Sequence, residues 1–280
     1  MSIASPGLRF GCGFATVLIS LAGYALPTIA QSGTPSSVGV PPVKTGLPLD
    51  FEHSMVGVQF GVGQNMQQEA FTCPCGATFN NGKGMGWNAA AFFELPVTAY
   101  LFAGIKAGLD RMNTNSSYLA SEIVTLETSS GQLDTVALIL NRKGSLDLSL
   151  LSFEPFIQYQ VFRSNFFVQL GAGISDLTRS NFSQTRTMTS RSATLSDGTT
   201  INNLTFTNGS NTEELQSGSL TGANSLLFSG ILSVGYNFNA RRMTLAPTVT
   251  YNYPFSSPQS GGIWKIASLY ASVNVGYFLN

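Results

Sequence analysis

In eight segments of this chain, apolar side chains alternate with polar or small ones at every second residue. The segments are 55–63, 85–95, 99–110, 146–159, 166–174, 225–238, 242–253 and 267–279. Successive side chains of a β-strand point to opposite faces, so each segment is predicted to be a strand with one apolar face. None reaches the roughly 20 apolar residues that a membrane-spanning helix needs. The chain is therefore predicted to be all-β, with eight strands.

The connections between these segments are alternately short and long. Tight turns are predicted at 96–98, 162–164 and 239–241, and longer connections rich in Ser, Thr, Asn and Gly at 64–84, 111–145, 176–223 and 254–263. Tight turns at one end and long loops at the other are typical of bacterial outer-membrane barrels. We therefore predict an eight-stranded antiparallel up-and-down transmembrane β-barrel over 54–280, in the outer membrane of a Gram-negative-type bacterium.

Aromatic residues on the predicted outer face gather at two levels. Near the turns they are Phe93, Tyr159, Phe166, Tyr236, Phe238 and Tyr277, and near the loops Trp87, Phe228, Tyr251 and Tyr253. Membrane barrels carry such girdles where the lipid headgroups begin. A soluble sandwich would bury its apolar face, so this placement favours lipid contact.

The fourth segment changes the parity of its apolar positions. Leu146, Leu148 and Leu150 are even-numbered, whereas the apolar residues from Leu151 to Tyr159 are odd-numbered. If all of them face outward, one extra residue is needed near Leu150, which predicts a β-bulge there.

The first thirty residues have the pattern of a secretory signal peptide. Arg9 precedes an apolar stretch, and Pro27 and small residues follow it, which predicts cleavage between Ala30 and Gln31. Residues 31–53 are polar and rich in proline, so we expect a disordered periplasmic lead-in to the barrel.

After cleavage, two cysteines remain, Cys73 and Cys75, and export places them in an oxidising compartment. A disulfide between them would close a small loop. The alternative is a thiol or metal site, but two cysteines without a nearby histidine are at best half of a zinc site.

The repeated alternation and the ending Asn-Val-Gly-Tyr-Phe-Leu-Asn resemble the small outer-membrane barrels of the OmpA, OmpX and PorT type. In these families the last strand is an address for the barrel-assembly machinery. The resemblance implies that Asn274, Gly276 and Leu279 form that signal. The chain departs from the pattern at Asn280, where an aromatic residue is common.

An eight-stranded barrel is filled by its own side chains, which argues against a general diffusion porin. The predicted lumen contains the charged residues Glu94, Lys106, Asp110, Glu154 and Arg242. Buried charges are costly unless they pair, and Lys106 and Glu154 stand on neighbouring strands at similar distances from the turns. This pair either fixes the strand register or gates a small-ion conductance.

We expect no enzyme activity and no cofactor or metal. The only histidine, His53, precedes the first strand on the periplasmic side, so no histidine stands at the outer rim to act as a general base. The charged residues, 10% of the chain with zero net charge, form no basic stripe, which excludes nucleic acid as a partner.

The two longest connections are the expected functional regions. Loop 111–145 is predicted to be a hairpin above the membrane, whose free edge could bind an extended protein segment. Loop 176–223 is predicted to be a hydrophilic surface coat. We therefore predict a monomeric barrel with a structural or surface-interaction role, such as envelope integrity, adhesion or binding of an extracellular protein. Its other partners would be outer-membrane lipids and the assembly machinery. The alternatives are a narrow channel or small-ligand conduit, and an accessory of an envelope secretion system.

Overall fold

The computed structural model describes residues 53–72, 77–127, 131–161 and 164–279. The predicted signal peptide at 1–30, the lead-in at 31–53 apart from His53, and Cys73 and Cys75 lie outside these ranges. The described residues form strands and turns, with no helix that is long and apolar enough to cross a membrane.

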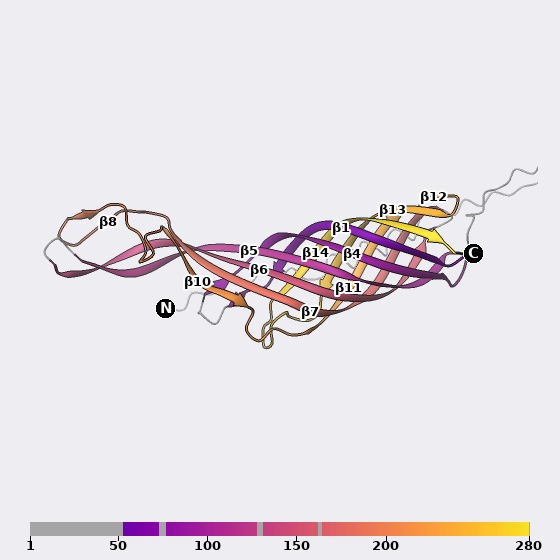
Figure 1. Ribbon diagram of the computed structural model, residues 1–280, viewed down its shortest axis with the longest axis horizontal. Coiled ribbons are helices and arrows are strands. Elements are labelled where there is room, and N and C mark those ends of the chain that lie inside the picture. The colour runs from indigo at the N-terminus through magenta and orange to yellow at the C-terminus, as the bar shows by residue number, and fades with distance from the viewer. Residues whose placement is uncertain (1–52, 73–76, 128–130, 162–163, 280) are drawn as a thin grey trace, which may run out of the picture. The chain divides into compact units, whose positions relative to one another are not determined.

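Eight antiparallel strands form a closed ring (Figure 1), which confirms the predicted barrel. They are β1 (Met55–Gln68), β4 (Lys83–Pro96), β5 (Leu101–Glu127), β6 (Leu133–Gln160), β7 (Phe166–Met188), β11 (Leu226–Tyr236), β13 (Met243–Pro254) and β14 (Lys265–Phe278). Each strand pairs with the next, and β14 pairs with β1 from Met55–Phe278 to Gln68–Lys265, which closes the barrel.

Six shorter strands lie in the connections. They are β2 (Phe71–Thr72), β3 (Thr78–Phe79), β8 (Ala193–Thr194), β9 (Thr200–Ile201), β10 (Thr212–Ser219) and β12 (Phe238–Ala240). β10 pairs with β7 over Asn181–Thr187, beyond the part of β7 that pairs with β11. Loop 176–223, expected to be only a hydrophilic coat, therefore contains paired strands.

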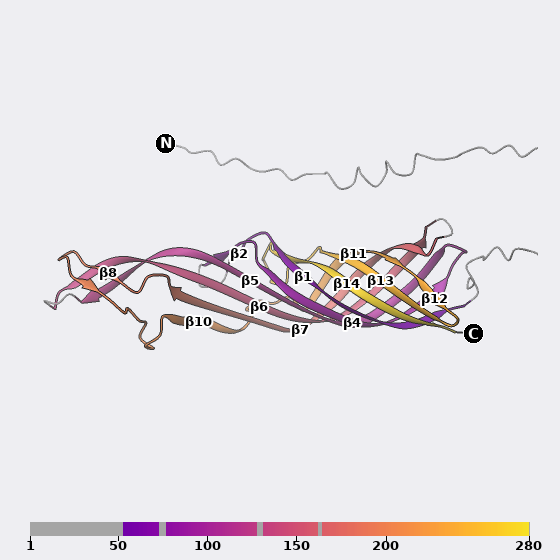
Figure 2. The same ribbon diagram turned by 90° about the horizontal axis from the view of Figure 1, so that it is seen from above.

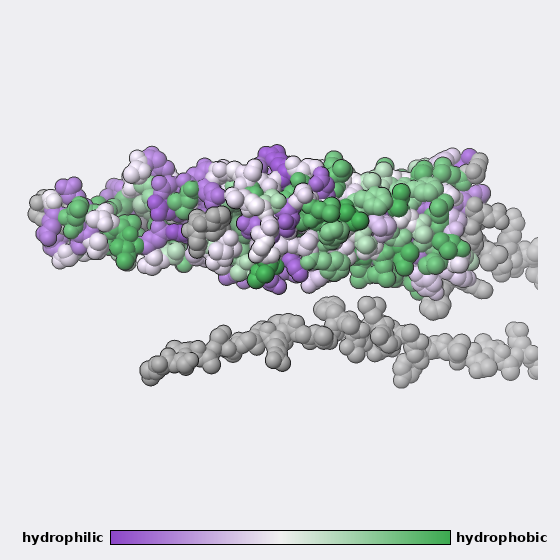
Figure 3. All heavy atoms as spheres, turned by 90° about the horizontal axis from the view of Figure 1, so that it is seen from below, coloured by the Kyte–Doolittle hydropathy of each residue, from purple (hydrophilic) through white to green (hydrophobic). Residues whose placement is uncertain are grey.

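The outer surface of the ring is apolar and its interior is polar. On β1, Val58 and Phe60 are exposed while Gln59 between them is buried. The same alternation buries Gln158, Gln169, Ser233, Thr250 and Ser268. Hydrophobic side chains cover the barrel, and hydrophilic ones are more frequent towards the end with the long connections (Figure 3). This distribution is the reverse of that of a soluble protein, and it matches a barrel whose outer face meets lipid.

The three leucines at the start of the fourth predicted segment face inward, so their predicted position on the outer face is wrong. Leu146, Leu148 and Leu150 are buried, and the even residues of β6 continue to face the interior down to Gln158. A register shift does occur beside Leu150, as predicted, but the extra residue is Thr178 on β7. Apolar residues of β6 thus change from even to odd positions because the barrel interior changes, from apolar near the long connections to polar further along the strand.

At the end of the barrel with the tight turns, phenylalanine rings fill the lumen. Phe92, Phe156 and Phe167 are buried, and each ring lies over a glycine directly opposite it on the neighbouring strand: Gly57, Gly104 and Gly235 respectively. A Cβ added at any of these glycines would lie between 2.3 and 2.5 Å from a ring atom. Glycine therefore makes room for the ring, a known way of filling small barrels.

At the opposite end, an apolar cluster closes the lumen. Its buried members are Phe71, Ala77, Phe79, Met112, Leu146, Leu148, Leu150, Phe182, Leu220, Trp264 and Ile266. The β2–β3 hairpin contributes Phe71, whose ring contacts Trp264 edge-on at 4.9 Å and Phe182 at 5.2 Å. The polar part of the lumen is thus enclosed between two apolar layers.

Candidate functional site

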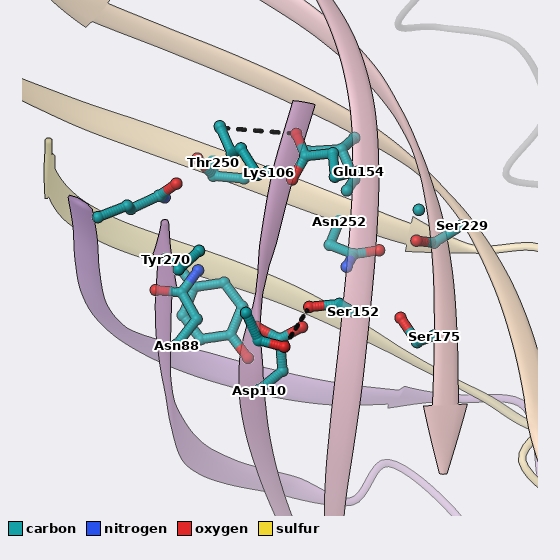
Figure 4. Close-up of a pocket in the computed structure, with 15 residues that line it drawn as sticks. Asn88, Lys106, Asp110, Ser152, Glu154, Ser175, Ser229, Thr250, Asn252 and Tyr270 are labelled. Atoms are coloured by element: carbon teal, nitrogen blue, oxygen red, sulfur yellow. Dashed lines mark hydrogen bonds and ion pairs between the residues drawn. The ribbon is translucent and has the colours of Figure 1, made fainter. Parts of the chain in front are cut away.

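Between the two apolar layers lies a small polar cavity of about 40 Å³ (Figure 4). Its lining includes Asn88, Lys106, Asp110, Ser152, Glu154 and Tyr270. This volume holds a few water molecules and no larger ligand.

Lys106 is the central charge of the cavity. Its Nζ lies 3.6 Å from Glu154 Oε1, directly across the β5–β6 pairing, and 5.1 Å from the centre of the Phe156 ring. Gln169 Nε2 donates a hydrogen bond to the same Glu154 Oε1 at 3.3 Å. Lys106 is 5% exposed and is the only buried basic residue in the described ranges.

Two further carboxylates interact with Lys106. Glu94 is buried on β4. Asp110 lies four residues beyond Lys106 on the same face of β5, where Ser152 donates a hydrogen bond to it (Figure 4). The prediction that Arg242 belongs to this cluster is wrong. Arg242 is exposed beside the β12–β13 turn, where Arg241 has a φ of 54°, and its Nη1 lies 3.4 Å from the Tyr277 hydroxyl. The turn places it outside the barrel end.

The lumen charges form a compact ionic cluster around one cation. Apolar side chains lie on both sides of the cavity along the barrel, the phenylalanine layer towards the tight turns and the apolar cluster towards the long connections. The arrangement suits a register-fixing interaction more than a conducting gate.

The second candidate site stands beyond the barrel rim. The last pair between β4 and β5 is Lys83–Asn115, yet β5 and β6 remain paired as far as Glu127–Leu133. A transmembrane strand needs about 9–11 residues, whereas β5 has 27. We call the part of the sheet beyond Asn115 the projection; it consists of 116–127, 133–144, 184–188 and 212–216, with 189–211 packed on it. Figures 1 and 2 both show β5 and β6 running past the other barrel strands.

An ion-pair chain ties the four strands of the projection together. Glu122 of β5 accepts hydrogen bonds from Arg142 Nε at 2.6 Å and from Arg186 Nη1 at 2.8 Å. Arg186 Nε also donates to Glu213 Oε2 at 2.7 Å. Arg142 and Arg186 are directly opposite in the β6–β7 pairing, where like charges are destabilising. Glu122 and Glu213 together supply two negative charges for the two arginines, and Glu122, which contacts both, bridges them.

One face of the projecting hairpin is covered by the chain that follows β7. The buried residues Leu138, Leu140, Met188, Ala193 and Leu204 form a separate core there, against which Val124, Leu126 and Phe206 pack. Near the hairpin tip, Asp134 Oδ2 accepts a hydrogen bond of 2.6 Å from the Ser196 backbone N–H. This bond lowers the pKa of Asp134 and anchors the covering segment.

The opposite face of the hairpin is apolar and uncovered. Leu119 is 66% exposed and Ile123 78% exposed, and Leu133 and Ile139 are also exposed on the same face. Within the described ranges, the backbone hydrogen bonds of 117–126 are confined to the pairing with β6. The projection therefore presents a free strand edge next to an apolar face, a combination typical of protein-binding surfaces.

The residues of the predicted assembly signal lie on the last strand. Asn274 is buried and donates to Thr248 Oγ1 at 3.2 Å, while Gly276 lies against the Met55 side chain. Leu279 is exposed on the outside, and its N–H donates to the Ser54 carbonyl at 2.7 Å. Their proposed recognition by the assembly machinery stays a prediction.

Sequence reasoning found the hairpin but missed the ion-pair chain. Glu122, Arg142, Arg186 and Glu213 are up to 91 positions apart in the sequence, and only the strand register brings them together. The one available signal was the period-two pattern that continues through 117–126, beyond the length of a transmembrane strand.

His53 lies just before β1, at the turn end of the barrel. No group of three or more His, Cys, Asp or Glu side chains within the described ranges is arranged to hold a metal ion.

No family model and no curated protein matches this chain. Solved structures do match, at low identity. Ail, the attachment invasion locus protein of Yersinia pestis, is 9% identical, with 80% of this chain and 99% of that chain covered and a TM-score of 0.32. Neisserial surface protein A is 13% identical, with 80% and 97% covered and a TM-score of 0.33.

The outer membrane protein OprG from Pseudomonas aeruginosa is 12% identical, with 81% of this chain and 96% of that chain covered and a TM-score of 0.27. The specific resemblance to the OmpA, OmpX and PorT families stays a prediction, and function has to be argued from this chain's own residues.

Proposed function

We propose that this protein is an outer-membrane barrel that binds another surface through its projection, without catalysis. The carrying observation is the contrast between the two candidate sites. Aromatic and aliphatic side chains occupy much of the lumen, whereas the projection exposes apolar side chains and a free strand edge at the end opposite the tight turns. In an outer-membrane barrel this end would face the exterior.

The membrane location rests on the apolar outer face of the barrel. Aromatic residues on that face lie at two levels, such as Tyr159 and Tyr277 near the turns and Phe228 and Tyr253 near the long connections, and all four are exposed. Exposed aromatics in two bands are expected where a barrel crosses the two lipid interfaces. Lipids and the barrel-assembly machinery would then be its other partners.

The rigidity of the projection supports a binding role. A loop that only shields the surface needs no fixed structure, but this one has its own apolar core around Leu140 and an ion-pair chain through Glu122. Ordering these residues during folding has an entropic cost. A surface that is already rigid then loses less conformational entropy when it binds a partner, so the order favours binding.

The runner-up function, a narrow channel or small-ligand conduit, is less well supported. It would have to use the cavity around Lys106, which holds about 40 Å³ and lies between the Phe92 layer and the Phe79 layer. Conduction would require movement of at least one of these layers.

The test is adhesion of cells that carry the protein with and without the hairpin. Residues 117–143 would be replaced by an Asn-Gly turn, which joins paired strands in a short hairpin. We expect adherence to surfaces or to other cells to fall to the level of cells lacking the protein. The truncated barrel should still migrate differently in unboiled and boiled SDS samples. Unchanged adherence with an intact barrel would refute the binding role.

A further inference from the structure

The free edge of β5 carries little of the usual protection against strand pairing. Natural edges are shielded by lysines, prolines, bulges or covering segments. The stretch from Ser117 to Leu126 contains no proline or lysine, and its one charged residue, Glu122, is bound to Arg142 and Arg186. No bulge interrupts the β5–β6 register there. The edge is therefore ready to accept another strand.

The order of residues along this edge is self-complementary about Ser121. In an antiparallel pairing of the edge with itself, Leu119 lies opposite Ile123 of the second copy, and Ser121 lies opposite Ser121. On the other face, Ala120 lies opposite Glu122, so the carboxylates stay apart. A centre at Glu122 would instead place two carboxylates opposite each other, and like charges in that position are destabilising.

We propose that two copies of this protein associate by antiparallel pairing of Ser117–Thr125 along β5. The proposal rests on the proposed surface role and names its partner as a second copy of this chain. The paired edges would add backbone hydrogen bonds and would join the two exposed apolar faces, because a two-fold axis perpendicular to the sheet keeps both outer faces on one side.

The direction of pairing determines where the second copy stands. Copies in one membrane are related by an axis along the membrane normal, which makes the two edges parallel. That axis also turns the sheet over, so the exposed face around Ile123 of one copy would continue into the covered face around Leu140 of the other. Antiparallel pairing joins copies that point towards each other, so it connects two facing membranes. The predicted monomer then applies within a single membrane.

Cysteine cross-linking tests the register in a Cys73→Ser/Cys75→Ser background. Directly opposite residues in antiparallel strands have Cα atoms about 4.5–5.5 Å apart, a separation that a disulfide spans. Under mild oxidation in detergent, Ser121→Cys should form covalent dimers. Leu119→Cys alone should stay monomeric, but mixed with Ile123→Cys it should form a heterodimer.

Self-linking by Leu119→Cys as efficient as that by Ser121→Cys would show that the pairing is not centred on Ser121, and would overturn the proposal. Absence of dimers for Ser121→Cys would overturn it as well. Every variant is checked for a heat-modifiable band. A folded barrel that fails to dimerise refutes the self-pairing and leaves the proposed surface role intact, whereas loss of the heat-modifiable band from the parent protein refutes the proposed membrane barrel.

Vesicle clustering tests the facing-membrane geometry. Protein reconstituted with the projection outward should cluster vesicles, as followed by light scattering. Ile123→Lys, which places a charge on the paired edge, should weaken clustering about tenfold or more, whereas Leu133→Lys should change it less than twofold. Leu133 is 70% exposed, close to the 78% of Ile123, and lies on the same face, but it belongs to β6 and not to the free edge of β5. Dimers without clustering, or equal effects of the two lysines, would refute the geometry.

Discussion

The lumen cluster predicts an asymmetry between the two members of its closest ion pair. Lys106 interacts with Glu154, Glu94 and Asp110, whereas Glu154 has Lys106 as its nearest cation. Lys106→Met would therefore leave three acidic side chains of the lumen without a positive charge beside them. Glu154→Gln would leave Lys106 with two acids and preserve the hydrogen-bonding shape at position 154.

The magnitudes follow from the burial of the groups. Removing one partner of a buried pair costs about 3–5 kcal/mol when the remaining charge is uncompensated, which is the case for Lys106→Met. Losing one hydrogen bond while charge compensation remains costs about 1–2 kcal/mol, which is the case for Glu154→Gln. We expect Lys106→Met to be the more destabilising by about 2 kcal/mol, or roughly thirtyfold in the unfolding equilibrium.

Reversible urea unfolding in detergent micelles, followed by fluorescence of Trp87 and Trp264, measures both values. Asn252→Ala, at another residue lining the cavity, controls for effects of altered packing. Equal losses for the two charge variants, or a larger loss for Glu154→Gln, would show that Glu94 and Asp110 do not share the lysine, and the reasoning would fail.

Three further predictions concern the inner leucines, the projection and the lumen. Leu148→Ala, at a side chain 1% exposed inside the barrel, should lower the free energy of unfolding by about 2–5 kcal/mol. In the same urea experiment, Leu151→Ala on the exposed face should lower it much less. The reverse order would contradict the inward position of Leu148. Glu122→Gln removes a negative charge from between Arg142 and Arg186, which should lower the stability of the projection by about 1 kcal/mol. Limited proteolysis of the projection should then be about fivefold faster, while the heat-modifiable band stays unchanged. An unchanged rate would show that the ion-pair chain does not hold the strands. In planar bilayers the wild-type protein should give no single-channel steps, and steady conductance abolished by Lys106→Met would favour the conduit instead.

The barrel could be predicted from the sequence because its signals are local. Strand alternation, as in 55–63, and the contrast between short and long connections determine strand number and topology together. Alternation alone does not say which face is outside, however. In β6 the rule that apolar side chains face lipid held for Phe153 and Ile157 and failed for Leu146 and Leu148, because the lumen becomes apolar near the loop end.

The projection could be predicted only in part. The hairpin of β5 and β6 was visible because its two strands are close in sequence and both alternate. The pairing of β7 with β10 was not, since Thr212–Ser219 is polar and its partner depends on a register set by Thr178 and the strands below. The contact of Glu122 with Arg186 could not be predicted either, because it depends on the same strand register. Lys106 and Glu154, in contrast, stand at matching heights on adjacent strands and could be placed as neighbours.

Protease shaving of intact cells, read by mass spectrometry of the protected fragments, tests the central claim most directly. The account predicts cleavage in the projection and its connections, within 128–132 and 189–223, while the barrel strands such as Leu101–Asp110 and Lys265–Phe278 stay protected. Protection of the projection in intact cells, with cleavage there only after lysis, would contradict the claim that this barrel presents a binding surface to the exterior.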